Sequence, residues 1–319
     1  MKKFYFIICS IFCCVNILAQ NIEKFYNWEW EECSPKVARF YSVIEKKDSL
    51  YYRNDFFIRE KSLQMKGSYL DADCKIENGK FYYFHANGSL EKLGNYVDGK
   101  KEGLWLSYHQ NKMMNDSTFY KNGNVIGTSM SWHNNGFAAD STTLNENGVG
   151  VSVGWFDNGF LSYAGRYSEE KKQTGKWIYF HKNGKKSALE TYSEGELIEK
   201  TYFDEDGIQL ADTNNRNKDV VFEKGEKAWN KYINRALYFP NNYKFENGDS
   251  AIVVVQFTIN EDGKVENVIV TNPFYPAFDR IVVYVIKNSP KWLPAISHNR
   301  NVKTVIKQTV NFIQTHREY

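Results

Sequence analysis

The sequence predicts a mainly β protein with a small α+β part, in which an antiparallel β-hairpin repeat array precedes a C-terminal domain of two helices and three strands. Three observations lead to this prediction: a repeat of about 24 residues in the middle of the chain, a turn signal inside each repeat, and a change of apolar spacing from two residues to 3.6 after residue 218. The 319 residues are enough for about two domains, and an aromatic content of 16% favours strands.

The N-terminal segment, residues 1–20, predicts a signal peptide. Lys2 and Lys3 precede an apolar stretch, and Leu18-Ala19-Gln20 provides a cleavage site. The alternative is an inner-membrane anchor through residues 4–19, but these 16 residues are fewer than the roughly 20 that a spanning helix needs. We therefore expect export and cleavage, and a mature protein in the periplasm or cell envelope.

The cysteines divide between the signal segment and the mature chain. Cys9, Cys13 and Cys14 leave with a cleaved signal peptide, so Cys33 and Cys74 remain as a pair in an oxidising compartment. They are candidates for a disulfide. The alternative, two unpaired buried thiols, fits the sequence equally well.

A repeat occupies the middle of the chain, with steps of 24, 24, 23, 25 and 23 residues between units. Such a regular period indicates stacked units, because one hairpin cannot bury its apolar face alone. An aromatic residue opens each turn segment. The six segments are Phe84-His85-Ala86-Asn87-Gly88, Tyr108-His109-Gln110-Asn111-Lys112, Trp132-His133-Asn134-Asn135-Gly136, Trp155-Phe156-Asp157-Asn158-Gly159, Phe180-His181-Lys182-Asn183-Gly184 and Phe203-Asp204-Glu205-Asp206-Gly207.

Turn chemistry predicts that every unit is a hairpin. Asn-Gly and Asp-Gly favour tight hairpin turns, because both central residues of such a turn take positive φ. A second set of turns between the units reverses the chain again and predicts an antiparallel meander. These second turns are Asp98-Gly99, Asn122-Gly123, Asn147-Gly148 and Glu194-Gly195.

Two segments of the array carry a resemblance. Glu102-Gly103-Leu104-Trp105-Leu106-Ser107-Tyr108 and Thr174-Gly175-Lys176-Trp177-Ile178-Tyr179-Phe180 resemble MORN-type repeats of the YwqK-like antitoxin group. The pattern spans residues 79–210, and we expect further strands over residues 21–78, so the predicted repeat domain is 21–210. The resemblance implies a fold more than a function, since one fold can host unrelated functions.

Four histidines occupy one position of the repeat: His85, His109, His133 and His181. One interpretation is a ladder of metal ligands. The other is a ladder of hydrogen-bonding rings, which needs no ion, and we prefer it because no acidic or thiolate co-ligands recur at this position. We therefore expect no metal site.

The C-terminal hundred residues predict a different kind of domain. Residues 211–221 form a polar linker, and the domain covers 222–319. A first helix follows from apolar residues spaced three and four apart, and Pro240 ends it. The apolar residues of this helix are Trp229, Tyr232, Ile233, Ala236 and Leu237.

Three strands and a second helix complete the predicted domain. The strand Ala251 to Ile259 has one core face, and Asp262-Gly263 turns it into a second strand over residues 264–271. Pro290 stops the second helix, and a last strand alternates apolar and polar residues from Val302 onward. The apolar residues of this helix are Phe278, Ile281, Val282, Val285 and Ile286.

This element order and four local motifs resemble the TonB C-terminal domain family over residues 222–312. The motifs are Phe222-Glu223-Lys224-Gly225, Tyr238-Phe239-Pro240, Thr258-Ile259-Asn260-Glu261-Asp262-Gly263-Lys264-Val265 and Ser289-Pro290-Lys291-Trp292-Leu293-Pro294-Ala295. The resemblance implies a binding domain that captures an outer-membrane receptor or other envelope protein by strand addition at a free sheet edge. The partner-binding residues it implies are Phe239, Pro240, Thr304, Val305, Ile306, Lys307, Gln308, Thr309 and Val310.

Charge and motifs exclude other classes. With 41 basic and 38 acidic residues, the sequence shows no basic footprint for nucleic acid. It contains no nucleophile elbow, phosphate loop or paired-cysteine metal motif, so we expect neither catalysis nor a cofactor.

Two functions fit these features. The first is an exported envelope protein whose TonB-like domain binds a periplasmic partner, in relation to energy transduction to outer-membrane transport. The alternative is a structural or interaction protein in which the repeats contact lipid, cell wall or protein without energy coupling. The inward or outward direction of Trp105, Trp132 and Trp177 distinguishes a core role from a binding surface.

Overall fold

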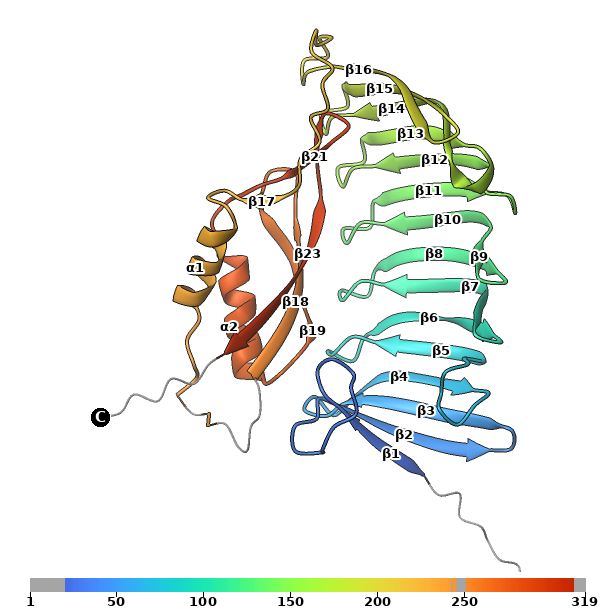
Figure 1. Ribbon diagram of the computed structural model, residues 1–319, viewed down its shortest axis with the longest axis vertical. Coiled ribbons are helices and arrows are strands. Elements are labelled where there is room, and N and C mark those ends of the chain that lie inside the picture. The colour runs from blue at the N-terminus through green and yellow to red at the C-terminus, as the bar shows by residue number, and fades with distance from the viewer. Residues whose placement is uncertain (1–20, 242, 245–250, 313–319) are drawn as a thin grey trace, which may run out of the picture.

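The computed structural model describes residues 21–241, 243–244 and 251–312, and the predicted signal peptide lies outside these residues (Figure 1). The described chain is mainly β, with two α-helices, as predicted. A tall antiparallel sheet forms one part, which we call the repeat array, and the residues from 221 onward form the C-terminal unit beside it.

The repeat array is a 16-stranded antiparallel sheet in which strands that follow one another in sequence pair in space, and β9 pairs only with β8. The resulting meander needs no crossover connection. Its strands are β1 (Ile22–Tyr26), β2 (Phe40–Lys47), β3 (Leu50–Phe57), β4 (Ser62–Tyr69), β5 (Gly79–Phe84), β6 (Leu90–Val97), β7 (Lys100–Tyr108), β8 (Met114–Lys121), β9 (Asn124–Val125), β10 (Gly127–Trp132), β11 (Ala138–Leu144), β12 (Gly150–Trp155), β13 (Leu161–Tyr167), β14 (Gln173–Phe180), β15 (Lys186–Ser193) and β16 (Glu196–Tyr202). A 3-10 turn, Glu169–Lys171, lies between β13 and β14.

The turn type predicted inside the units was wrong, although the hairpins themselves are present. In the first unit only Gly88 has positive φ, and the turn carries hydrogen bonds from Gly88 N to His85 O and from His85 N to Ser89 O. This is a longer loop that ends in a left-handed glycine. The two-residue turn with both φ values positive occurs instead between units, at Asp98-Gly99.

Aromatic rings lie over glycines of the neighbouring strand on one face of the array. Trp105 and Trp177 are each 2% exposed, and they cover Gly94 and Gly165. Each indole also donates to a backbone carbonyl, Trp105 Nε1 to Asn95 O at 3.1 Å and Trp177 Nε1 to Arg166 O at 3.0 Å. These two tryptophans therefore belong to the core, whereas Trp132 is only half-buried.

The C-terminal unit contains a three-stranded sheet in the order β19-β18-β23, two helices and two short strand pairs. The predicted order of helix, strand, strand, helix and strand is present, with the short strands added between. Its elements are β17 (Val221–Phe222), α1 (Glu226–Ala236), β18 (Ala251–Ile259), β19 (Val265–Asn272), α2 (Pro276–Lys287), β20 (Trp292–Leu293), β21 (Ala295–Ser297), β22 (Arg300–Val302) and β23 (Thr304–Phe312).

The core of the C-terminal unit lies between the helices and one face of its sheet. Every apolar residue predicted for the second helix is buried, and β18 turns Val253, Val255, Phe257 and Ile259 inward, all 0% exposed. One boundary was wrong: the last strand begins at Thr304, because Val302 belongs to β22 and pairs with Ala295.

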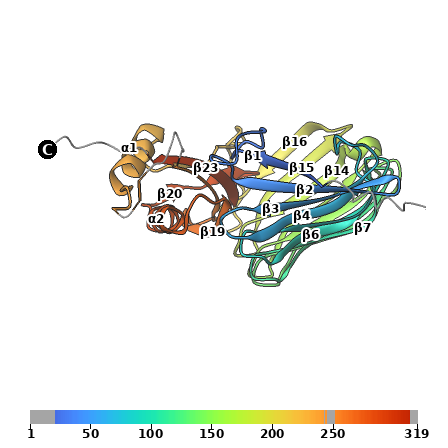
Figure 2. The same ribbon diagram turned by 90° about the horizontal axis from the view of Figure 1, so that it is seen from below.

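The C-terminal unit stands alongside the array at the ends of the strands where the hairpin loops of the repeats lie (Figure 1). Its helices lie on the side away from the array (Figures 1 and 2). The end of the segment predicted as a linker pairs with this unit, since Lys218 exchanges two backbone hydrogen bonds with Ile296. The open face of the small sheet therefore faces the repeat loops.

Candidate partner-binding edge and its surroundings

The candidate site is the outer edge of β23. This strand pairs with β18 along its whole length, from Ala251 opposite Phe312 to Ile259 opposite Thr304. On its other side it pairs with no strand among the described residues. Its outward N–H and C=O groups are therefore available to an added strand.

The side chains of β23 alternate between two environments. Ile306 and Val310 pack into the core under the helices, and Gln308 accepts a hydrogen bond from Trp229 Nε1 at 2.9 Å. Lys307 and Thr309 are exposed on the other face. A peptide strand added at this edge would pair with β23, which the core packing of Ile306 and Val310 holds in place.

The two pieces of the predicted site are connected through Phe278, near the C-terminal end of β23. The half-buried ring of Phe239 packs edge-on against Phe278 at 5.2 Å between centroids, and Phe278 contacts Phe312 at 4.8 Å in the same way. Pro240 accepts a hydrogen bond from Tyr243 N through its carbonyl. Phe239 and Pro240 therefore belong with the C-terminal end of β23, whereas Thr304 and Val305 lie at the opposite end.

A match to a known protein family includes the candidate edge. Residues 236–313 match the Gram-negative bacterial TonB protein C-terminal family. The match starts at the last residue of α1 and includes β18, β19, α2 and β23, so it supports the family resemblance for this part of the chain. It does not reach the repeat array, and the MORN resemblance stays a prediction. No curated protein matches the chain.

This family match points to the cell envelope and to a TonB-like role in energy transduction there. Within the described part of the chain, neither helix has the length and apolar character needed to cross a bilayer.

The sequence did not predict the contact that fixes the C-terminal unit to the array. The tip of the β21–β22 hairpin, His298-Asn299-Arg300, packs against strands of the last repeats. The His298 ring stacks on Tyr179, and its Nδ1 lies 2.9 Å from Glu190 Oε2. Asn299 donates to the carbonyl of Phe203 at 2.8 Å. A polar tip of this kind gives no apolar signal in a sequence.

Arg300 is a buried cation of this contact, with 7% exposure. It donates to the carbonyl and the hydroxyl of Ser162 and, at 3.0 Å, to the carbonyl of Phe180. Burial lowers its pKa to about 10, so the guanidinium stays protonated at neutral pH. Its donors pair with carbonyl groups near the start of β13 and at the end of β14, as buried polar groups require.

A group of ion pairs lies next to the hairpin tip. Asp157 of the fourth repeat turn bonds to Lys303 at 2.8 Å and to Lys182 at 2.9 Å. Lys303 also pairs with Glu266 of β19, and Lys182 pairs with Glu261. Burial alone would raise the pKa of Asp157, but the bonds from Lys303 and Lys182 outweigh it and lower the pKa to about 2.

The other end of the C-terminal unit is held at the start of the array. The guanidinium groups of Arg39 and Arg59 lie over the ring of Phe274, at 3.8 and 4.5 Å from its centroid. Asn272 donates to the carbonyl of Trp28 at 2.7 Å. The small sheet is therefore attached to the array near both of its ends.

The repeat histidines act as hydrogen-bonding rings. The Nε2 atom of each one lies within hydrogen-bond distance of a carbonyl in the next unit, at 2.8 to 3.1 Å. These pairs are His85 with Tyr108, His109 with Trp132, His133 with Trp155 and His181 with Phe203. Among the described residues no three potential metal ligands cluster.

Cys33 and Cys74 are free thiols, so the candidate disulfide is not formed. Cys33 follows β1, and Cys74 lies in the loop between β4 and β5. Burial raises the pKa of both thiols, that of Cys74 to about 11. A raised pKa keeps a thiol protonated and poorly reactive at neutral pH.

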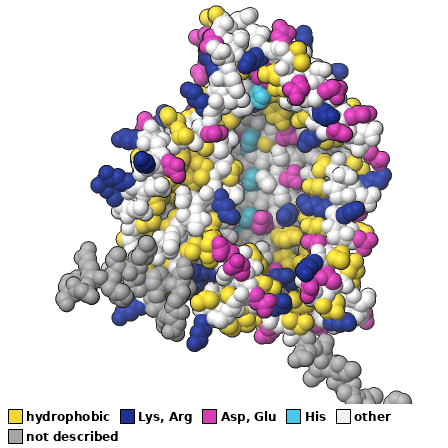
Figure 3. Space-filling view, in the orientation of Figure 1, with side chains coloured by type: hydrophobic (Ala, Val, Ile, Leu, Met, Phe, Trp, Pro, Cys, Tyr) yellow, Lys and Arg dark blue, Asp and Glu magenta, His cyan; other side chains and the backbone are white. Residues whose placement is uncertain are grey.

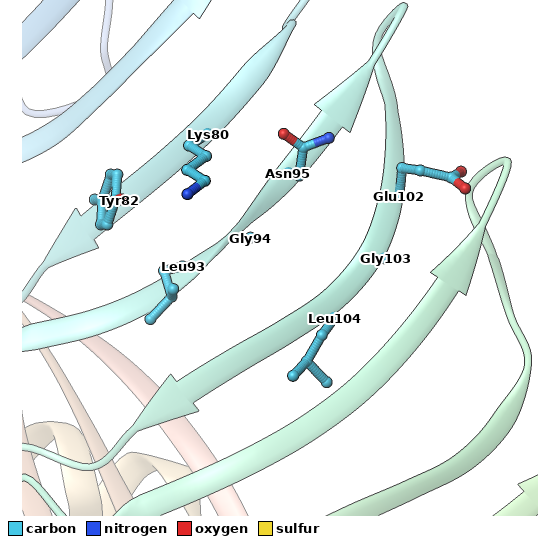
Figure 4. Close-up of a pocket in the computed structure, with 8 residues that line it drawn as sticks. All are labelled: Lys80, Tyr82, Leu93, Gly94, Asn95, Glu102, Gly103 and Leu104. Atoms are coloured by element: carbon cyan, nitrogen blue, oxygen red, sulfur yellow. The ribbon is translucent and has the colours of Figure 1, made fainter.

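The outer face of the array carries a shallow hollow of about 300 Å³ between β5, β6 and β7 (Figure 4). Lys80, Tyr82 and Leu104 stand around it, and Gly94 forms part of its floor. Gly94 borders the hollow with its backbone, and a side chain at this position would point to the opposite face, where Trp105 lies.

Proposed function

We propose that this is an exported envelope protein whose C-terminal unit captures an extended segment of a partner, such as an outer-membrane receptor, by strand addition at the free edge of β23. The observation behind this proposal is that β23 has one paired side and one unpaired side within a region that matches the TonB C-terminal family. Main-chain pairing at such an edge provides affinity without a catalytic group. We propose binding rather than catalysis.

The repeat array supports this role as a rigid platform. It contacts the C-terminal unit near both ends of the small sheet, and the helices cover the sheet face that points away from the array. The unpaired edge of β23 is then the remaining place where a chain can pair with this strand. In this proposal the array fixes the direction from which a partner approaches.

A pair of proline variants tests strand addition. The N–H groups of neighbouring residues in a strand point to opposite sides. Of the two variants Lys307→Pro and Gln308→Pro, one therefore removes a hydrogen bond to β18, and the other removes only a donor on the unpaired edge. Gln308→Ala controls for loss of the Trp229 contact. The probe is a set of peptides from receptor plug segments, measured by pull-down and calorimetry.

The expected result is that the proline variant with the unchanged melting temperature binds the peptides at least about tenfold more weakly, since it lacks an outward donor. Gln308→Ala should bind normally. Equal capture by both proline variants and the parent protein would remove strand addition at β23 as the mechanism.

A second candidate function rests on exposed apolar side chains in one repeat position. Met113, Phe137 and Phe160 directly follow the turn residue of their units and are 41%, 53% and 52% exposed. A row of this kind favours contact with lipid or another surface. Sedimentation with anionic vesicles tests it: the parent protein should pellet and a Phe137→Ser/Phe160→Ser variant should not. Failure of the parent protein to pellet excludes lipid contact.

A further inference from the structure

A polar hollow of about 580 Å³ separates the open face of the small sheet from the repeat turns. The array contributes His85, His109 and Asn111 to its wall, and the C-terminal unit contributes Gln256, Thr258 and Val305. Histidine side chains form a column in the hollow between the two parts (Figure 3). The volume lies within the range of small-molecule sites, about 300 to 1,000 Å³.

The wall is rich in neutral hydrogen-bonding groups and has no net charge. Its side chains are mostly amides, hydroxyls and imidazoles. The wall contains one acidic residue, Glu91, and one lysine, Lys92, and it contains no arginine. A site for phosphate would need several cations, and a site for a metal would need several anionic ligands. Neither is present in the described wall, so the chemistry favours an uncharged polar ligand.

Several of these polar groups are free to bind a ligand. Gln256 and Thr258 are half-buried on β18, and their side chains bond to no described residue. Amide and hydroxyl groups both donate and accept, which matches a ligand whose hydroxyls do the same. Val305 of β23 and Ile269 of β19, which flank β18 on its two sides, add apolar surface to the same wall of the hollow.

We propose that this hollow binds a short neutral oligosaccharide. Its hydroxyls would bond to Gln256 and Thr258, and a C–H face of one sugar ring would lie on Val305. Because the wall comes from both parts of the protein, the bound sugar would bridge them and stabilise their contact. This site shares Val305 with the candidate edge of β23, but sugar binding does not require strand addition.

The test measures binding of maltotriose and triacetylchitotriose to the full protein by saturation-transfer NMR and by thermal shift. Trigalacturonic acid serves as the acidic counterpart. Two variants address the wall: Gln256→Ala/Thr258→Val removes hydrogen bonds, and Val305→Trp fills space without touching the core. Lys80→Ala, on the outer hollow of Figure 4, is the matched control.

At least one neutral sugar should bind, and it should bind about tenfold more weakly to both wall variants and equally well to Lys80→Ala. Circular dichroism checks that each variant is folded, and Val305→Trp decides the result if the double variant is not. The proposal is overturned if neither neutral sugar binds, if the acidic sugar binds as well as they do, or if the wall variants bind like the parent protein. Peptide capture at β23 should not change in Gln256→Ala/Thr258→Val or in Lys80→Ala, whose residues lie outside β23, and this separates the sugar site from the proposed function.

Discussion

The imidazole of His298 lies flat on the ring of Tyr179, with 3.7 Å between centroids and an angle of 4° between the planes. The two residues are far apart in sequence and belong to different parts of the protein. The Nδ1 atom of the same imidazole reaches the buried carboxylate of Glu190. One side chain of the C-terminal unit therefore makes both an aromatic and an electrostatic contact with the array.

Replacing His298 should loosen the docked hairpin tip. His298→Phe keeps the stacking on Tyr179 but leaves Glu190 with Tyr192 as its remaining side-chain donor among the described residues, and His298→Ala loses both contacts. We expect about 1 kcal/mol of lost unfolding free energy for phenylalanine and about 2 to 3 kcal/mol for alanine. Urea unfolding measures both values. Equal losses for the two variants would mean that the stacking contributes nothing.

Arg300→Met should detach the C-terminal unit more strongly than any exposed arginine variant. The methionine fills much of the space but leaves the carbonyls of Ser162 and Phe180 without their donor, at a cost of about 3 kcal/mol. Arg216→Met is the control, because the Arg216 side chain is 40% exposed and its pair with Asp212 is long, at 3.8 Å. Limited proteolysis between the two parts should accelerate for Arg300→Met alone. Unchanged cleavage would show that the docking does not depend on this residue.

Acid should weaken the ion pairs around Asp157. Its folded pKa of about 2 is below the unfolded value of about 4, so its contribution is complete above pH 4 and is lost as the pH falls toward 2. The difference corresponds to about 2 kcal/mol. Asp157→Asn should be less stable than the parent protein at pH 7, and the gap should close near pH 2. A gap that stays constant across this range would contradict the assignment.

Asp279 should have the opposite pH dependence. Burial raises its folded pKa to about 6, above the unfolded value of about 4, so the folded protein loses stability as the pH rises from 4 to 6. Asp279→Asn keeps an acceptor for Phe274 N and removes the charge. We expect the variant to be about 1 to 2 kcal/mol more stable than the parent protein at pH 7 and similar to it at pH 4. Thermal unfolding at the two pH values measures this, and a less stable variant at pH 7 would refute it.

Gly165→Ala should destabilise the array. A methyl group at this position would overlap the Trp177 ring, which has to move out of its place, and overpacking of this kind costs about 1 to 3 kcal/mol. Ser129→Ala on β10 is the control, since the Ser129 hydroxyl is buried without a hydrogen-bond partner among the described residues. The control should melt at the parent temperature or slightly above it. If Gly165→Ala also melts there, the ring is not held over the glycine.

Local patterns predicted much of this fold. The apolar alternation of residues 251–259 gave the bounds of β18, and the helical spacing around Val282 identified the buried side of α2. The turn type inside the units could not be predicted in this way, because Asn-Gly suits both a two-residue turn and a longer loop that ends in a left-handed glycine. The register in which the two strands of the hairpin pair decides which of these two turns forms.

The contact between the two parts could not be predicted either. Arg300 is buried by strands that lie more than a hundred residues earlier, and its neighbours in sequence are polar. No periodic pattern reports such long-range burial. For the candidate edge, the apolar alternation at Ile306, Val310 and Phe312 correctly predicted a strand and its core-facing side chains, but it could not show that Phe239 lies near the C-terminal end of this strand, against Phe278.

The two attachments of the C-terminal unit constrain the length of the repeat array. Phe274 is held near β2 and β3, and Arg300 is held near β13 and β14. The strands between these two attachments must therefore span a fixed distance, the one between Phe274 and Arg300 in the C-terminal unit. Inserting or deleting a single unit would change the length of the array between them by about 10 Å, two strand spacings, and one attachment would have to break. Repeat arrays often gain or lose units during evolution, but in this protein the span of a folded neighbour restricts their number.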